Sequence, residues 1–272
     1  MRNTALSLLL SLLATSLGCN TSERTSNEET WTEGQALTAN DVWHTVHNIM
    51  VTANDVHYAL KTLDAGLIDG PNSSQCPLTH NELRGESGAT GTSFASLPTS
   101  TSSLSLFDSR FDRMYEQYSH CTPFSTNAMR AFAYAYSRQI STTEWDGHLG
   151  LFFMTKERCV WYVQRYWHGE TCRDFEVNSH LQIAAGAAEL RMNTATIQSR
   201  RPIGQYSADT LTTLLVAGHV VGTQAFARLA GYEPTKPREV CRLLFDVLWE
   251  ESLILPPDSE RRNAETECQK YR

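Results

Sequence analysis

The stretch RQISTTEWDGHLGLFF, residues 138–153, places two carboxyl groups, Glu144 and Asp146, in a polar turn before an apolar run. Two carboxylates that lie close together raise the pKa of one of them, and a carboxyl group with a raised pKa can act as a general acid. The alternative is that both acids are solvated or cap the next helix. The stretch is therefore a candidate active-site corner, or what remains of one.

A second group of residues with possible chemistry lies near the start of the chain. His44 and His47 are one helical turn apart, and Asp41 precedes them by another turn. A zinc site needs at least a third protein ligand, and the sequence fixes none. Neither CxxC nor CxxCH occurs in the chain. We therefore predict no metal site and no cofactor.

Composition limits the class of protein. The chain has 272 residues, of which 41% are hydrophobic and 19% are charged, with a formal net charge of −7. This suits a globular protein with one sizeable core or two small ones. No run of Lys and Arg is available to neutralise phosphates, so we expect no nucleic-acid partner.

The first eighteen residues have the pattern of a signal peptide, with Arg2 followed by the apolar stretch 5–17 and by Gly18. This apolar stretch is too short to span a bilayer. Cys19 directly after a small residue resembles the lipobox of bacterial lipoproteins, although Ser16 stands where that family usually has Leu. The resemblance implies a lipid on Cys19 that attaches the chain to a membrane. Because Asn20 follows, it also implies an outer-membrane lipoprotein facing the periplasm. The alternative is ordinary secretion.

An exported chain with an even number of further cysteines is typical of a disulfide framework. Cys159 and Cys172 are the favoured local pair, because a short loop can close them. The sequence leaves open the pairing of the others, which are Cys76, Cys121, Cys241 and Cys268.

The chain divides into five segments by composition and periodicity. We predict a signal peptide over 1–18, a tether over 19–36, an N-terminal helix over 37–66, a Gly/Ser/Thr-rich loop over 67–105 and a helical domain over 106–272. Within that domain, helices are expected to begin near Ser125, Thr155, Asn178, Ser207 and Pro237, the last long helix ending at Pro256-Pro257. No strand pattern is found. The fold class is therefore mainly α.

Four segments in this domain, over roughly residues 125–250, resemble the lytic transglycosylase branch of the lysozyme-like fold. RQIS is similar to the RQES of that family, and GLFF to its GLMQ. EVNSHLQIAAGAAELR is similar to its Asn-containing helix, and AGHVVG to its AAYNAG. The resemblance implies a lysozyme-like domain, here with an extra N-terminal helix, a long irregular loop and disulfides.

Departures from the family pattern fall on its polar residues. The Glu of RQES, which donates a proton to the glycosidic oxygen, is Ile140 here. Phe153 replaces the Gln of GLMQ, and His219 replaces the Tyr of AAYNAG. Gly150, Leu151 and Gly222 remain as residues that shape the backbone.

These matches predict a groove for peptidoglycan glycan lined by Ile140, Trp145, Phe153 and His219, with Trp145 stacking on sugar and Trp161 and Trp167 in the core. We expect a catalytically impaired relative of the lytic transglycosylases. One alternative is an active glycosidase that uses Glu144. The other is a helical envelope interaction protein in which the four groove positions are packed shut.

Overall fold

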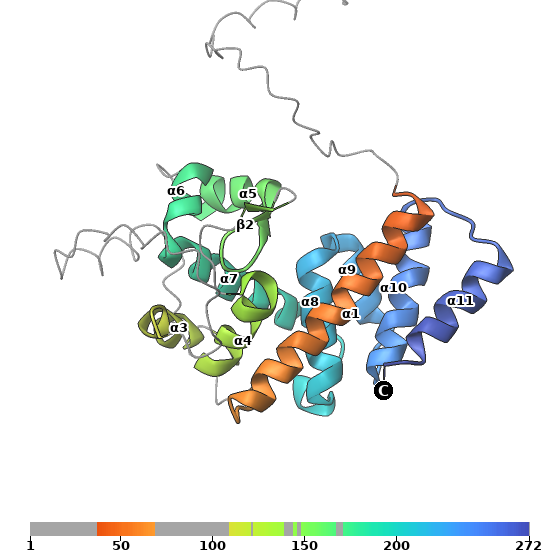
Figure 1. The fold of residues 1–272 in the computed structure, drawn as a ribbon, viewed down its shortest axis with the longest axis horizontal. Helices are drawn as coiled ribbons and strands as arrows, with labels where there is room; N and C mark the ends of the chain where they lie inside the picture. The colour runs from red at the N-terminus through yellow and green to blue at the C-terminus, as the bar shows by residue number, and fades with distance from the viewer. Residues whose placement is uncertain are drawn as a thin grey trace, which may run out of the picture. The chain divides into compact units, whose positions relative to one another are not determined.

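The computed structural model describes residues 37–68, 109–120, 122–138, 144–145, 148–166 and 171–271. All described residues belong to one compact unit, residues 36–272. Helices dominate this unit, which confirms the mainly α class (Figure 1). They are α1 (Ala39–Thr62), α3 (Asp112–Ser119), α4 (Thr126–Ser137), α5 (Lys156–Tyr166), α6 (Cys172–Val177), α7 (Ser179–Gln198), α8 (Ala208–Val220), α9 (Thr223–Gly231), α10 (Pro237–Glu251) and α11 (Asp258–Cys268), with a 3-10 turn η1 (Ile203–Gln205).

Three of the predicted helix starts are confirmed by side-chain caps. Ser125 accepts a hydrogen bond from the Ala128 N–H at the start of α4, and Ser207 caps α8 in the same way. Asn178 Oδ1 accepts from the His180 and Leu181 N–H groups in the first turn of α7, at 3.0 and 3.4 Å. These side chains satisfy N–H groups that have no partner inside their helices.

Helix α1 packs against α4, α8 and α10 and contributes its apolar stripe to the common core. The ring of Trp43 in its first turns meets Phe245 of α10 edge-on at 4.6 Å. Near the other end, Asp55 accepts a 2.8 Å hydrogen bond from Arg138. Figure 1 shows α1 running beside α8 and α10. The N-terminal helix is therefore part of the same core as the helices that follow residue 109.

Three two-residue strands follow α4, where the sequence predicted none. They are β1 (Glu144–Trp145), β2 (His148–Leu149) and β3 (Met154–Thr155), which pair antiparallel in the order β1-β2-β3. Trp145 opposes His148, which in turn opposes Thr155. Strands of two residues cannot display the alternation by which a sequence indicates a strand. The prediction was wrong for this reason.

Four helices were also missed, since no start was predicted for α3, α6, α9 or α11. The short α6 lies between α5 and α7, and α11 follows Pro257, beyond the expected end of the last long helix. In α11 only Ala264 and Cys268 are buried, so no apolar stripe marks this helix.

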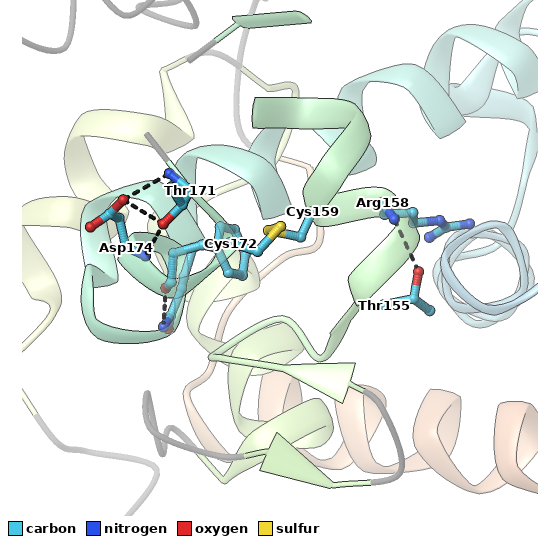
Figure 2. The surroundings of a disulfide bond; sticks show 8 residues. Thr155, Arg158, Cys159, Thr171, Cys172 and Asp174 are labelled. Atoms are coloured by element: carbon cyan, nitrogen blue, oxygen red, sulfur yellow. Dashed lines mark hydrogen bonds between the residues drawn. A yellow bond between two sulfur atoms is a disulfide. The ribbon is translucent and has the colours of Figure 1, made fainter. Parts of the chain in front are cut away.

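Two cysteine pairs link neighbouring helices. Cys159 of α5 pairs with Cys172 of α6, as the sequence predicts, with 5.8 Å between their Cα atoms (Figure 2). Cys241 of α10 pairs with Cys268 of α11. Cys19, Cys76 and Cys121 lie outside the described residues. In the part of the chain that is described, no helix has the length and apolar character to cross a membrane.

Candidate functional site

The candidate corner follows the C-terminus of α4. The helix ends at Ser137, whose hydroxyl donates to the Leu151 carbonyl oxygen at 2.8 Å. Arg138 then adopts the left-handed conformation, with φ of 55°. Ile140 and Asp146 lie outside the described residues, as do the side chains of Glu144 and Trp145. The roles predicted for these four side chains therefore stay predictions.

The turn from Gly150 to Phe153 is held by the side chain of Gln182, from α7. The Leu151 N–H donates to Gln182 Oε1 at 3.0 Å, and Gln182 Nε2 donates to the Phe175 carbonyl oxygen at 2.9 Å. Gly150 has φ of +72°, and a Cβ there would lie 2.5 Å from Gln182 Cδ. Only glycine satisfies both the backbone angle and the close approach of Gln182.

His219, at the end of α8, packs against the buried side of this turn. Its Nε2 is 3.4 Å from the Phe153 carbonyl oxygen, and its Nδ1 is 3.4 Å from Glu189 Oε2. The ring centroid is 4.4 Å from that of Tyr136. His219 is only 7% exposed, and Leu151 is fully buried. These two residues therefore lie on the buried inner side of the corner, called its floor below, and not on its solvent-exposed surface.

An ion pair between Arg158 and Glu189 completes the floor. Arg158 Nη1 donates to Glu189 Oε2 at 2.7 Å. The same guanidinium donates to the carbonyl oxygens of Gly218, His219 and Val221. These are among the last carbonyls of α8, which have no partner within the helix. Arg158 therefore joins α5, α7 and the end of α8.

Tyr136 adds a buried phenol to this group. Its hydroxyl has no hydrogen-bond partner among the described residues, although the residue as a whole is half-buried. Burial, and next the negative charge of Glu189, raise the pKa of the Tyr136 hydroxyl well above its usual range. Tyr136, Arg158, Glu189 and His219 are called the buried polar cluster below.

The structure thus brings together four of the predicted site residues. Gly150, Leu151 and Phe153 lie in one turn, and His219 contacts that turn from below. Gly222 lies outside it as the N-cap of α9, in open space. Phe153 is half-buried with φ of 52°, and its ring stacks on His148 at 4.8 Å.

Sequence reasoning missed Gln182, Arg158 and Glu189. A signal existed for Glu189, because a single carboxylate within the apolar run IAAGAAEL must find a buried partner. Nothing in the sequence indicates that the partner is Arg158. Trp161, predicted to lie in the core, is 41% exposed, while Trp167 is outside the described residues.

This arrangement limits the chemistry of the floor. Glu189 is 5% exposed and has its charge offset by Arg158, so it has no open path to a leaving oxygen. Among the described residues no group of three or more His, Cys, Asp and Glu side chains could hold a metal ion. What the corner offers to a ligand is a rigid turn and the stacked rings of His148 and Phe153.

A cavity of about 420 Å³ lies elsewhere, between α1, α10 and α11, lined in part by Trp43, His44, His47 and Phe245. Its one acid, Glu267, forms an ion pair with Lys270. Asp41, one turn before the two histidines, accepts hydrogen bonds from Thr38 at the start of α1, and the described residues contain no group of three possible metal ligands here.

Comparison of the chain with protein-family models, with curated proteins and with solved structures finds no match. The fold and the corner therefore define a mainly helical, disulfide-linked protein with a buried polar cluster beneath a rigid turn. The lysozyme-like fold stays a prediction.

Proposed function

We propose that this chain is an envelope lipoprotein, anchored by a lipid on Cys19, whose lysozyme-like domain binds peptidoglycan glycan without cleaving it. The observation that carries the proposal is the turn from Gly150 to Phe153. It is fixed by Gln182 and His219, yet none of the side chains that the structure describes around it is an accessible acid.

The convergence of the matched segments supports a lysozyme-like arrangement. GLFF and AGHVVG meet where His219 contacts the Phe153 carbonyl oxygen, across 66 positions of sequence. The Asn-containing helix, α7, reaches the same place through Gln182 and Glu189. Three segments that resemble motifs of one family, in the same order, also lie close together in space. Chance matches to those motifs would not be expected to meet at one place in the fold.

The absence of cleavage follows from the residue types. A glycosidase needs a carboxyl group of raised pKa that can protonate the leaving oxygen. Ile140 has no proton to give, and the Glu189 carboxylate is tied to Arg158. Binding survives the loss of that acid, because it depends on shape and on aromatic faces.

The stacked rings of His148 and Phe153 supply such a face. Their planes differ by 8°, and both residues are half-buried. Trp145 is the backbone partner of His148 in the small sheet. Amphipathic ring surfaces of this kind suit the apolar face of a sugar.

Sedimentation of the protein with purified sacculi tests the binding. Phe153→Asn removes the ring but keeps a residue type that tolerates the left-handed backbone. We expect this variant to lose most of the sedimented fraction. The matched control is Tyr58→Ser, which removes a 63% exposed ring on α1, and it should sediment like the wild type. Equal sedimentation of all three proteins would contradict a site at Phe153.

A second candidate is an envelope interaction protein that has no glycan site. The burial of Leu151 and His219 favours it, because tight packing under the turn would also stabilise a helical scaffold that has no ligand site. It predicts no sedimentation of any variant with sacculi. The same experiment therefore separates the two functions.

A further inference from the structure

Two leucines protrude from the connection between α10 and α11. Leu253 and Leu255 are each 91% exposed, more than any other large apolar side chain that the structure describes. Single exposed leucines are common on protein surfaces, but two at nearly full exposure in one short loop are not. Residues 252–257 are called the leucine loop below.

The leucine loop is held by its neighbours. The Ile254 N–H between the two leucines donates to the Trp249 carbonyl oxygen at 2.8 Å, and its side chain packs on the core. Leu253 has φ of 55°, a left-handed backbone conformation that residues with a side chain rarely adopt. Pro256 is buried, and Pro257 is the N-cap of α11. The exposure of the two leucines is therefore fixed by the backbone.

The leucine loop lies at the end of the unit where the chain enters α1. Trp43, in the first turns of α1, contacts Phe245, which is less than two turns from the end of α10. Figure 1 shows the start of α1 beside that end of α10, from which the loop departs. Leu37, where the described residues begin, therefore lies at this end of the unit.

The charges that flank the loop nearly balance, because the acids Glu250, Glu251, Asp258 and Glu260 are accompanied by the arginines Arg228, Arg261 and Arg262. Glu250 and Glu251 both form ion pairs with Arg228 of α9. The Arg261 guanidinium lies over the Trp249 ring, 5.9 Å from its centroid. A surface without strong net charge is thus the most compatible partner, since neither sign is favoured.

We propose that Leu253 and Leu255 insert into the interfacial layer of a zwitterionic lipid bilayer, as a second membrane contact beside the lipid on Cys19. The inference rests on the proposed envelope location, but it does not require glycan binding. A convex pair of leucines suits lipid, because acyl chains deform around it and remove both side chains from water. A second contact at the end of the unit where α1 begins would add the burial of two leucine side chains to the attachment that the lipid provides.

Hydrogen exchange on the full chain with Cys19→Ser, with and without phosphatidylcholine vesicles, tests this contact. The substitution removes the predicted lipid, and amide-resolved exchange distinguishes the loop from the apolar stretch 5–17, which stays in the chain. Vesicles should slow exchange of the Leu253 and Leu255 amides, and flotation with vesicles should become about tenfold weaker in Leu253→Ser/Leu255→Ser. Tyr58→Ser, at the other end of α1, is the matched control and should float like its parent.

Two results would overturn the proposal. Unchanged exchange of the amides of residues 252–255 would show that lipid does not meet the loop, even if the chain floats through its apolar stretch 5–17. Protection that rises with protein concentration and needs no vesicles would assign the leucines to a second copy of the chain. Loss of sacculus binding with retained vesicle protection would affect only the proposed glycan function.

Discussion

Glu189 is the residue on which the floor of the candidate site depends. Its carboxylate is buried and faces both Arg158 and His219. Glu189→Gln keeps the shape and removes the charge, which leaves Arg158 without its counter-ion. We expect the free energy of unfolding to fall by about 2–3 kcal/mol, because an uncompensated charge would remain largely buried. Urea denaturation followed by circular dichroism measures this.

The control for Glu189 is an ion pair on the surface. Glu250→Gln breaks the pair of Arg228 with a carboxylate that is 60% exposed. Exposed pairs contribute little, so a loss below about 1 kcal/mol is expected. Equal losses in the two variants would mean that Glu189 is not the support described above.

Gly150 is the second test at this scale. Gly150→Ala adds a Cβ that would lie 2.5 Å from Gln182 Cδ, at φ of +72°. We expect a loss of about 2–3 kcal/mol in unfolding free energy from backbone strain and the displaced Gln182. Gly204→Ala, where no atom lies within 4 Å of the added Cβ, should leave the stability unchanged or slightly raised. A neutral Gly150→Ala would contradict the close packing of the turn.

Residue types alone predicted the helix caps but not the floor of the site. Ser125, Asn178 and Ser207 act within a few positions of themselves, so their roles follow from local sequence. The contact of Gln182 with Leu151 spans 31 positions and depends on how α7 packs. The spacing of residues in a single sequence therefore does not predict this contact.

At the scale of elements, a helix could be predicted where its sequence shows an apolar stripe at helical spacing. Helices α1, α4 and α10 each bury one face in the core, and the sequence marks that face. The two-residue strands and the polar helix α11 have no such stripe. The strands are stabilised by pairing with one another, and α11 is linked to α10 by a disulfide.

Helix α11 should therefore depend on the bond between Cys241 and Cys268. Its buried residues are Ala264 and Cys268, and apart from the Arg261 guanidinium over the Trp249 ring little else holds it to α10. In Cys241→Ala/Cys268→Ala we expect the amides of α11 to exchange at least about tenfold faster. The amides of α8, which is buried along most of its length, should not change. Unchanged protection of α11 would show that packing alone holds this helix.

At the scale of the whole molecule, acidic caps make stability depend on pH. Hydrogen bonds from the Thr38 and Thr171 side chains lower the pKa of Asp41 and Asp174, and a hydrogen bond from the Thr235 N–H lowers the pKa of Glu239. A carboxyl group with a lowered folded pKa stabilises the protein above its unfolded pKa, near pH 4. That contribution is lost as the pH falls through the folded value.

The urea midpoint should therefore be lower at pH 3 than at pH 6. Burial raises the pKa of Asp246, which acts in the opposite direction and offsets part of the loss. Asp41→Asn/Asp174→Asn should show a smaller change between the two pH values than the wild type. An identical change in both proteins would mean that these caps are not the source.

The central claim, glycan binding without cleavage, is tested most directly by mass spectrometry of the material that the oxidised protein releases from purified sacculi. The account predicts that the protein sediments with the sacculi and releases no muropeptides above a blank without protein. Glu144→Gln should behave identically. Release by the wild type that disappears in Glu144→Gln would contradict the account, because it would show that a relocated acid performs the cleavage that Ile140 cannot.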